Sequence, residues 1–252
     1  MGGECFEPKD WRDFLNPVRN QRYCGCCWAI TAATAVEALW TIKHPLKHKI
    51  QLSAQELLDC CVENPKKVGL NTDKEGCYRY STKSAFKWIA ENGICYEEGY
   101  PFKGRKGKKE DNPYRSKAIV WIRKENGMPY KTIEDGDKDV VRMLKHHPVA
   151  ASMDLFKSFM TYKEGIYKTP RDNSDEKSIG GHAILIVGYD MEDGEDYYLI
   201  QNSYGKQWGL NGYGKISCSS QVQDKEGKWR PLIRNVCYPN VEICYANIEN
   251  PL

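Results

Sequence analysis

The chain has 252 residues, 40% of them hydrophobic and 28% charged, which suits a folded protein with a sizeable core and excludes a disordered or collagen-like chain. Lys and Arg number 37 against 34 Asp and Glu, and this charge of +3 is too small and too evenly spread to predict a nucleic-acid partner. No stretch approaches the ~18 apolar residues that span a bilayer, so no membrane partner is expected.

Helical spacing of apolar residues and terminal signals predict helices, most of them in the first half of the chain. The longest begins at Cys27 and is uninterrupted by Gly or Pro before His44-Pro45, which predicts a largely buried helix. A capping box at residues 53–56 opens the second, and Asn92-Gly93 ends the third, whose inward side chains are expected to be Ala85, Trp88 and Ile89. The expected helices are Cys27–Lys43, Ser53–Cys60, Ser81–Glu91 and Asp137–His146.

After about residue 115 the sequence changes to short apolar runs bounded by turn residues. Such runs predict strands, consistent with an antiparallel sheet or barrel. The contrast between the halves predicts an α+β protein of two lobes. The expected strands are Ala118–Arg123, Val149–Leu155, His182–Tyr189, Tyr197–Asn202 and Tyr213–Ser217.

Eleven cysteines are many for a reduced compartment, and their odd number leaves at least one thiol in a monomer. Their spacing does not match a zinc site, because Cys24, Cys26 and Cys27 lie too close together and Cys60-Cys61 is a direct pair. We therefore expect disulfides, no metal and no cofactor. No signal peptide is visible at the start of the chain, at Met1–Glu4.

Cys27 is the strongest candidate for a nucleophile, because it enters the first turn of the longest predicted helix. The positive end of the helix dipole and the unbonded N–H groups there favour a thiolate over a thiol. An arbitrary cysteine is more commonly a disulfide partner or a small buried apolar residue. The assignment therefore depends on further catalytic residues elsewhere in the chain.

Two such residues follow in the second half. His182 stands at the start of an apolar strand, where it could act as a general base, although a lone histidine beside a strand is more often structural. Asn202 comes twenty positions later and is followed by the aromatic residues Tyr204 and Trp208. An amide that orients an imidazole is the third member that a nucleophile–base pair needs.

The sequence resembles the papain-like cysteine peptidases over nearly its whole length. The matching segments, in the expected order, are Asp10–Arg12, Pro17–Gln21, Cys24–Trp28, Leu52–Cys60, Gly93–Ile94, Tyr100–Phe102 and the stretches around His182 and Asn202.

The resemblance implies a single domain over residues 1–252 with an active-site cleft between two lobes. The helical lobe would cover mainly 20–115, and an antiparallel barrel-like lobe mainly 116–235 plus the N-terminal segment. Cys27 would be the nucleophile, His182 its proton partner and Asn202 the residue that holds the imidazole. Gln21 would donate its side-chain amide to the oxyanion.

Several residues depart from the family pattern, above all Tyr78-Arg79-Tyr80 where Asn-Gly-Gly is common. Because bulky residues prevent close approach of a substrate backbone, these residues put peptide binding on the acyl side in doubt. Cys26 replaces a serine, and it is either buried and inert or part of a redox couple. The expected substrate-binding residues are Trp28, Arg79, Tyr80, Gly181, Tyr204 and Trp208.

The resemblance also implies disulfide pairs. Cys24 and Cys77 lie in matching motifs, whereas Cys60 lacks its usual partner and Cys95 is the nearest replacement. Cys237 would need Cys218 or Cys244 if it pairs at all. Cys5, Cys26 and Cys61 stay unassigned.

The intact set of catalytic residues predicts a hydrolase, a thiol protease that cleaves peptide bonds through a Cys27 acyl-enzyme. Arg22, Tyr23 and Tyr78–Tyr80 could instead narrow the site to a small amide or acyl substrate, as in an amidase, acyl transferase, ligase or lyase-type enzyme. A binding protein that only inherits the fold is the third alternative. The resemblance further implies a monomer, a pro-segment or protein inhibitor in the cleft, and an endomembrane, vacuolar, lysosomal or secreted location.

Overall fold

The computed structural model describes residues 7–108, 120–133, 137–169, 176–240 and 242–245. The chain divides into two compact units. The sheet unit comprises Met1–Asn20 and Thr132–Cys237, and the helical unit comprises Gln21–Lys131 and Tyr238–Leu252. No helix in the described ranges combines the length and apolar character that a membrane crossing needs.

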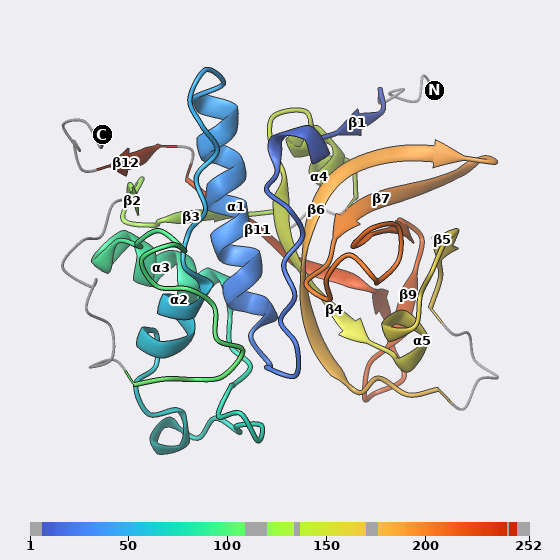
Figure 1. Cartoon of the computed structure of the whole chain (residues 1–252). Helices are drawn as coiled ribbons and strands as arrows, with labels where there is room; N and C mark the ends of the chain where they lie inside the picture. The colour runs from blue at the N-terminus through green and yellow to red at the C-terminus, as the bar shows by residue number, and fades with distance from the viewer. Residues whose placement is uncertain (1–6, 109–119, 134–136, 170–175, 241, 246–252) are drawn as a thin grey trace. The chain divides into compact units, whose positions relative to one another are not determined.

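Figure 1 labels most of the helices and strands of the described part of the chain. The helical unit contains α1 (Cys27–Lys43), α2 (Ala54–Cys60), η2 (Pro65–Val68), α3 (Thr82–Asn92) and β2 (Val120–Ile122). Strand β2 pairs with β12 (Ile243–Tyr245), which belongs to the same unit. The sheet unit contains β1 (Lys9–Asp10), η1 (Arg12–Phe14), α4 (Asp137–Leu144), β4 (Val149–Leu155), α5 (Lys157–Met160), β5 (Ile166–Tyr167), β6 (Gly180–Glu192), β7 (Glu195–Gln201), β8 (Tyr213–Ser217), β9 (Gln221–Gln223) and β10 (Trp229–Pro231). The chain crosses between the units within β3 (Tyr130–Thr132) and β11 (Ile233–Pro239).

Helix α1 has the predicted bounds and forms the core of the helical unit. Its residues from Cys27 to Thr41 are all buried, so the helix has no solvent-facing side over this length. It packs against α2 and α3. The buried carboxylate of Glu37 accepts a hydrogen bond from the Leu52 backbone N–H at 2.7 Å, and this bond satisfies a charge that would otherwise be costly to bury.

The shorter helices of this unit begin at the predicted caps. The Ser53 hydroxyl accepts the Glu56 backbone N–H at 3.0 Å, and Ser81 caps α3 in the same manner. The predicted inward face of α3 was partly wrong. Ala85 and Ile89 are buried as expected, but Phe86 is fully buried and Trp88 is only partly covered.

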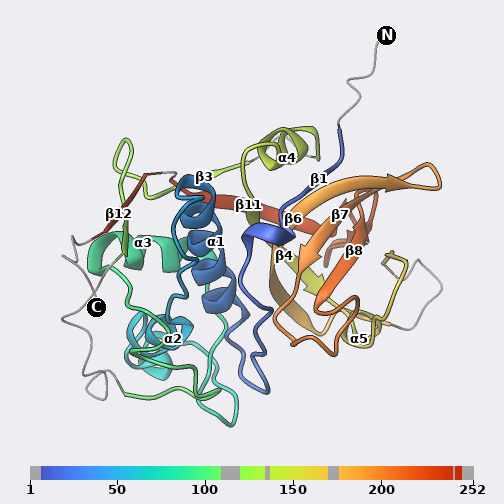
Figure 2. The same ribbon diagram turned by 45° about the horizontal axis from the view of Figure 1, so that its top comes forward.

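The sheet unit is organised around eight strands in the order β3-β11-β4-β6-β7-β8-β5, with β1 beside β6. Figure 2 shows β6 and β7 running together to a long hairpin. The described neighbours pair antiparallel, as expected for this lobe, except β5 and β8, which are parallel. Strands β4 and β8 have the predicted bounds, while β6 extends beyond both predicted ends.

Strand β1 connects the N-terminal segment to the centre of this sheet. Lys9 lies opposite Tyr189, and a Cβ on Gly188 would lie 2.3 Å from the Lys9 carbonyl oxygen. Only glycine permits so close a backbone approach. The neighbouring Trp11 indole donates to the Leu144 carbonyl at 2.7 Å, which fixes the segment against α4.

The cysteines follow the predicted pairing in one case. Cys24 and Cys77 form a disulfide with a sequence separation of 53. The expected Cys60–Cys95 disulfide is absent, since both residues are thiols. Asp59 stabilises this region by polar contacts, accepting hydrogen bonds from the Tyr100 hydroxyl at 2.7 Å and the Gly107 backbone N–H at 2.6 Å. The alternative pair of Cys237 with Cys218 is not formed either, and the side chain of Cys244 lies outside the described residues.

Candidate active site

Cys27 is the first residue of α1, and Cys26 is its N-cap. The carbonyl of Cys26 accepts the Ala29 and Ile30 N–H groups, so the helix begins directly at the candidate nucleophile. The Cys27 side chain therefore lies at the positive end of a 17-residue helix. That position favours the thiolate form.

The loop that precedes Cys27 is fixed on two sides. The disulfide joins Cys24 to Cys77, and Asp73 accepts the Gly25 N–H at 2.8 Å and the Cys77 N–H at 2.9 Å. One carboxylate thus bonds to the backbone on both sides of the disulfide. The sequence analysis missed Asp73, although Asp followed by Gly76 three positions later is a turn signal that could have identified it.

Gln21 lies in the same loop and is 8% exposed. Its side-chain amide donates to the Cys24 carbonyl at 2.8 Å. This hydrogen bond orients the amide within the segment that leads to Cys27. A fixed amide donor is what an oxyanion site requires, because it need not reorganise during reaction.

Cys26 is fully buried, as one of its two predicted alternatives required. Burial raises the pKa of its thiol well above the ordinary value, and the neighbouring charges of Cys27 and Asp73 raise it further. The thiol therefore stays protonated at neutral pH. A buried, protonated thiol is a poor nucleophile, which favours an inert Cys26.

His182 and Asn202 lie together in the sheet unit, where both are 4% exposed. His182 Nε2 is 2.7 Å from Asn202 Oδ1, which also accepts the Ser203 backbone N–H at 2.8 Å. Because a backbone N–H can only donate, the atom between them is the amide oxygen. Nε2 must then carry the proton that it donates, and Nδ1 is the ring atom available for proton transfer.

Aromatic rings surround this pair. Tyr204 lies 4.9 Å from the His182 ring, and Phe159 lies 4.9 Å from Trp208. The Trp208 indole is 5% exposed and donates to the Phe159 carbonyl at 2.8 Å. These rings keep water from the His182–Asn202 hydrogen bond. Phe159 and Tyr162, whose ring is 5.1 Å from Trp208, belong to this cluster and were missed from the sequence.

Comparisons with known proteins decide the family. A family profile described as papain family cysteine protease matches residues 6–228. Pro-cathepsin H of Bos taurus is 33% identical, over 83% of this chain and 60% of that protein. Cysteine proteinase 2 of Zea mays is 34% identical, over 86% and 56% respectively.

The chain belongs to the papain family of cysteine proteases.

A solved structure supports the same fold. Digestive procathepsin L 3 of Tenebrio molitor larval midgut matches with a TM-score of 0.70 at 25% identity, over 92% of this chain and 69% of that one. The predicted papain-like α+β fold is thus confirmed. The chain spans 56–60% of the length of the two curated relatives above.

The least family-like segment, Tyr78-Arg79-Tyr80, lies against α1 in the helical unit. Trp28 is 1% exposed, and its indole donates to the Tyr78 carbonyl at 2.8 Å. The rings of Tyr78 and Tyr80 lie 5.4 and 5.3 Å from the Trp28 ring. Arg79 and Tyr80 are exposed, so they remain candidates for substrate contact, whereas Trp28 can act only through the segment it supports.

The remaining predicted binding residues lie beside His182 in the sheet unit. Gly181 is exposed and directly precedes the histidine. Tyr204 contacts the imidazole, and Trp208 is buried behind it. Within the described ranges, no group of three or more His, Cys, Asp or Glu side chains could hold a metal ion.

Proposed function

We propose that this papain-family protein hydrolyses peptide bonds through a covalent Cys27 acyl-enzyme. The observation that carries the proposal is the His182–Asn202 pair, in which the 2.7 Å hydrogen bond leaves Nδ1 for proton transfer. The position of Cys27 at the start of α1 supports it from the helical unit. Family membership supplies the reason to assign both residues to one reaction.

In the proposed acylation step, the Cys27 thiolate attacks the carbonyl carbon of the scissile peptide. The C=O electron pair moves to the oxygen, which accepts hydrogen bonds from the Gln21 amide and the Cys27 backbone N–H. The His182 imidazolium then gives its Nδ1 proton to the leaving nitrogen as the C–N bond breaks. The products of this step are a free amine and a thioester on Cys27.

Deacylation returns the enzyme to its starting state. Neutral His182 takes a proton from water at Nδ1, and the resulting hydroxide attacks the thioester carbonyl. The C–S bond breaks, which releases the acyl group as a carboxylic acid and restores the Cys27 thiolate and the His182 imidazolium. Asn202 holds the ring through both proton transfers. We further propose that a pro-segment or a protein inhibitor competes with peptide for this site.

The test is cleavage of a mixed peptide library, read by mass spectrometry between pH 4 and 8. We expect Cys27→Ala to abolish cleavage while the variant keeps the circular dichroism spectrum of the folded parent. Cys26→Ser serves as the matched control, because it alters the adjacent thiol, and we expect it to retain activity. The proposal fails if Cys27→Ala cleaves as well as the parent, or if a folded protein with an alkylatable Cys27 cleaves no peptide.

A further inference from the structure

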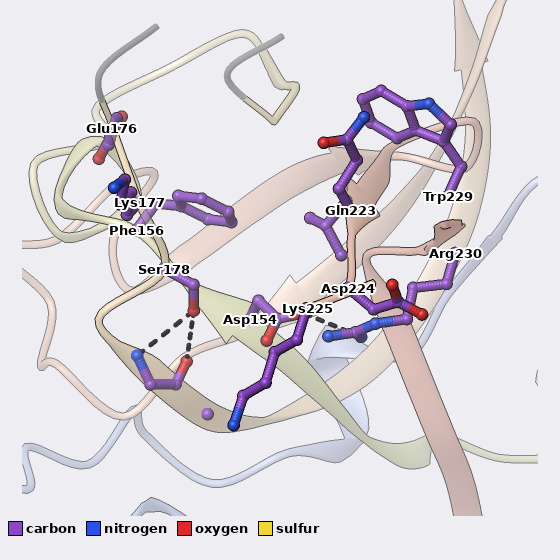
Figure 3. A pocket seen from close by; sticks show the side chains of 13 residues that line it. Asp154, Phe156, Glu176, Lys177, Ser178, Gln223, Asp224, Lys225, Trp229 and Arg230 are labelled. Atoms are coloured by element: carbon purple, nitrogen blue, oxygen red, sulfur yellow. Dashed lines mark hydrogen bonds and ion pairs between the residues drawn. The ribbon is translucent and has the colours of Figure 1, made fainter. Parts of the chain in front are cut away.

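The sheet unit contains a cavity of about 650 Å³. No residue of the proposed mechanism lines this cavity. Three segments line it: the end of β4 with the following Phe156, the stretch from Glu176 to Gly181, and the hairpin of β9 and β10 (Figure 3). Its size is within the range of pockets that bind ligands. Unlike a purely apolar pocket, it carries charged side chains on all three of these walls.

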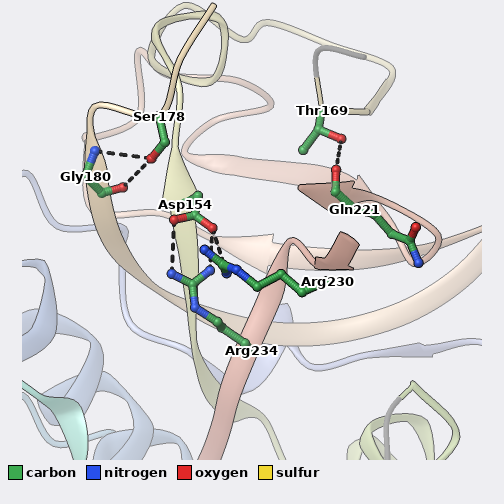
Figure 4. A network of polar contacts seen from close by, with 7 residues as sticks. All are labelled: Asp154, Thr169, Ser178, Gly180, Gln221, Arg230 and Arg234. Atoms are coloured by element: carbon green, nitrogen blue, oxygen red, sulfur yellow. Dashed lines mark hydrogen bonds and ion pairs between the residues drawn. The ribbon is translucent and has the colours of Figure 1, made fainter. Parts of the chain in front are cut away.

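The charges around Asp154 are unequal. Arg234 makes a bidentate contact with its carboxylate, Nη1 to Oδ2 at 2.5 Å and Nη2 to Oδ1 at 3.0 Å. Arg230 Nη1 lies 3.0 Å from the same Oδ2 (Figure 4). Two guanidinium groups therefore face one carboxylate, and a positive charge remains.

Arg230 is the cation with unused donors. Its Nη1 is buried and lies 3.0 Å from Asp154 Oδ2, whereas the side chain as a whole is 31% exposed. Because part of the side chain reaches the cavity, the guanidinium donors that do not face Asp154 can bind an acceptor there. A carboxylate is the acceptor that best fits the planar guanidinium.

The other acidic groups of the cavity already accept backbone hydrogen bonds. Asp224 accepts the Glu226 and Lys228 N–H groups within its own turn, and Glu176 accepts the Ser158 N–H at 2.6 Å. Lys225, by contrast, forms no ion pair with the described residues and lines the cavity near Arg230 (Figure 3). The cavity therefore offers cationic donors to a ligand.

The cavity also lies beside the catalytic histidine. Gly180 and Gly181 line it, and His182 follows directly in β6. A Cβ on Gly181 would have no neighbour within 4 Å, so the backbone there is open to an occupant. The partly exposed indole of Trp229 adds an apolar surface for the aliphatic part of a side chain.

We propose that this cavity binds an acidic side chain of the peptide substrate, with Arg230 as the residue that recognises its carboxylate. The proposal rests on the proposed peptidase function and adds a preference to it. Lys225 contributes a second positive charge. The enzyme should therefore prefer peptides that carry Glu over the same peptides with Gln at the position that reaches the cavity.

The experiment uses quenched fluorescent peptides that differ only in a Glu, Gln or Lys scanned through each position. We expect kcat/KM for the best Glu peptide to be about 10-fold above its Gln counterpart, as one charge-assisted hydrogen bond would give. Arg230→Gln should reduce this ratio to about 1, while Asp154 stays paired with Arg234. The control Arg123→Gln removes an exposed arginine of the helical unit and should leave the ratio unchanged.

A binding measurement separates failure of the cavity from failure of the peptidase function. In a Cys27→Ala background, fluorescence anisotropy gives Kd for the labelled Glu and Gln peptides with and without Arg230→Gln. Tighter binding of the Glu peptide that disappears in Arg230→Gln supports the cavity even if no peptide is cleaved. If peptides are cleaved but Glu and Gln peptides have equal kcat/KM and equal Kd at every position, the proposed recognition of an acidic side chain is wrong. The proposed peptidase function would still stand.

Discussion

The nucleophile and the general base are held in place by different means. Cys27 depends on the start of its own helix, on a disulfide that closes a 53-residue span, and on Asp73 within that span. His182 depends on the sheet, where Met153 lies opposite it, on Asn202, and on aromatic rings from α5 and from the segment after β7. A helix start and a covalent bond thus position the thiol, whereas strand pairing and ring packing position the imidazole.

The largest effect should come from removing the covalent constraint. Replacing Cys24 and Cys77 by alanine restores the conformational freedom of a 53-residue span in the unfolded chain. The chain-entropy relation then predicts that the free energy of unfolding falls by about 4 kcal/mol. Hydrogen exchange followed by mass spectrometry should show lost protection in peptides of the helical unit. Cys218→Ala is the control. Equal loss of protection in both units would contradict the separate roles drawn above.

A second change removes the group that orients the base. Asn202→Ala deprives His182 Nε2 of its acceptor, and we expect kcat to fall about 100-fold because proton transfer then needs a search for the right ring orientation. As the control, Asn240→Ala removes another buried asparagine and should leave kcat unchanged. An unchanged kcat in Asn202→Ala would mean that packing alone orients the ring.

A third change disturbs the cluster of aromatic rings around the His182–Asn202 pair. A Cβ on Gly214 would lie 2.8 Å from the Trp208 ring and 3.0 Å from the Tyr162 ring, so Gly214→Ala should cost about 2 kcal/mol by overpacking. Denaturant unfolding measures this loss. A double-mutant cycle with Trp208→Phe should show that the smaller ring relieves part of it. Strict additivity of the two changes would exclude contact between these positions as the cause.

The smallest effect concerns pH and the sheet unit. His147, two residues before β4, is buried, and burial lowers its pKa below the ordinary 6.5 despite a contact with the Pro148 carbonyl. The unfolded chain therefore binds a proton more readily, and stability falls as pH drops from 6.5 to the folded-state pKa, by at most about 1.4 kcal/mol per pH unit. His147→Gln should remove this part of the slope, and His48→Gln, in an exposed loop, should not. Unfolding curves between pH 8 and 5 provide the measurement.

The sequence predicted the elements whose signals are local. The caps Ser53 and Ser81 and the apolar run of α1 act within a few residues, and the structure has them where the sequence placed them. Strands such as β9 and β10 were missed because each is only three residues long and largely exposed, too short for a periodic pattern to be recognised. Each of these two strands forms because it pairs with the other, and the composition of one strand alone does not indicate that pairing.

The candidate site shows the same division. Residue types and motif order indicated Cys27, His182 and Asn202, and the family resemblance on which these roles rested is confirmed. Phe159 was not indicated, because its contact with Trp208 joins segments 49 residues apart and follows only from the fold. The Cys60–Cys95 disulfide is not formed. That pairing took Cys95 as the nearest replacement for a missing family partner, and nearness in sequence does not determine whether two thiols are bonded.

The pairing of β1 with β6 has a consequence for the order of folding. Lys9 meets Tyr189, so this contact cannot form on the ribosome until most of the chain has been synthesised. The main segment of the helical unit, by contrast, is continuous from Gln21 to Lys131. Because contacts distant in sequence form slowly, folding should start in that segment, and the N-terminal strand should be among the last parts to acquire its native neighbours.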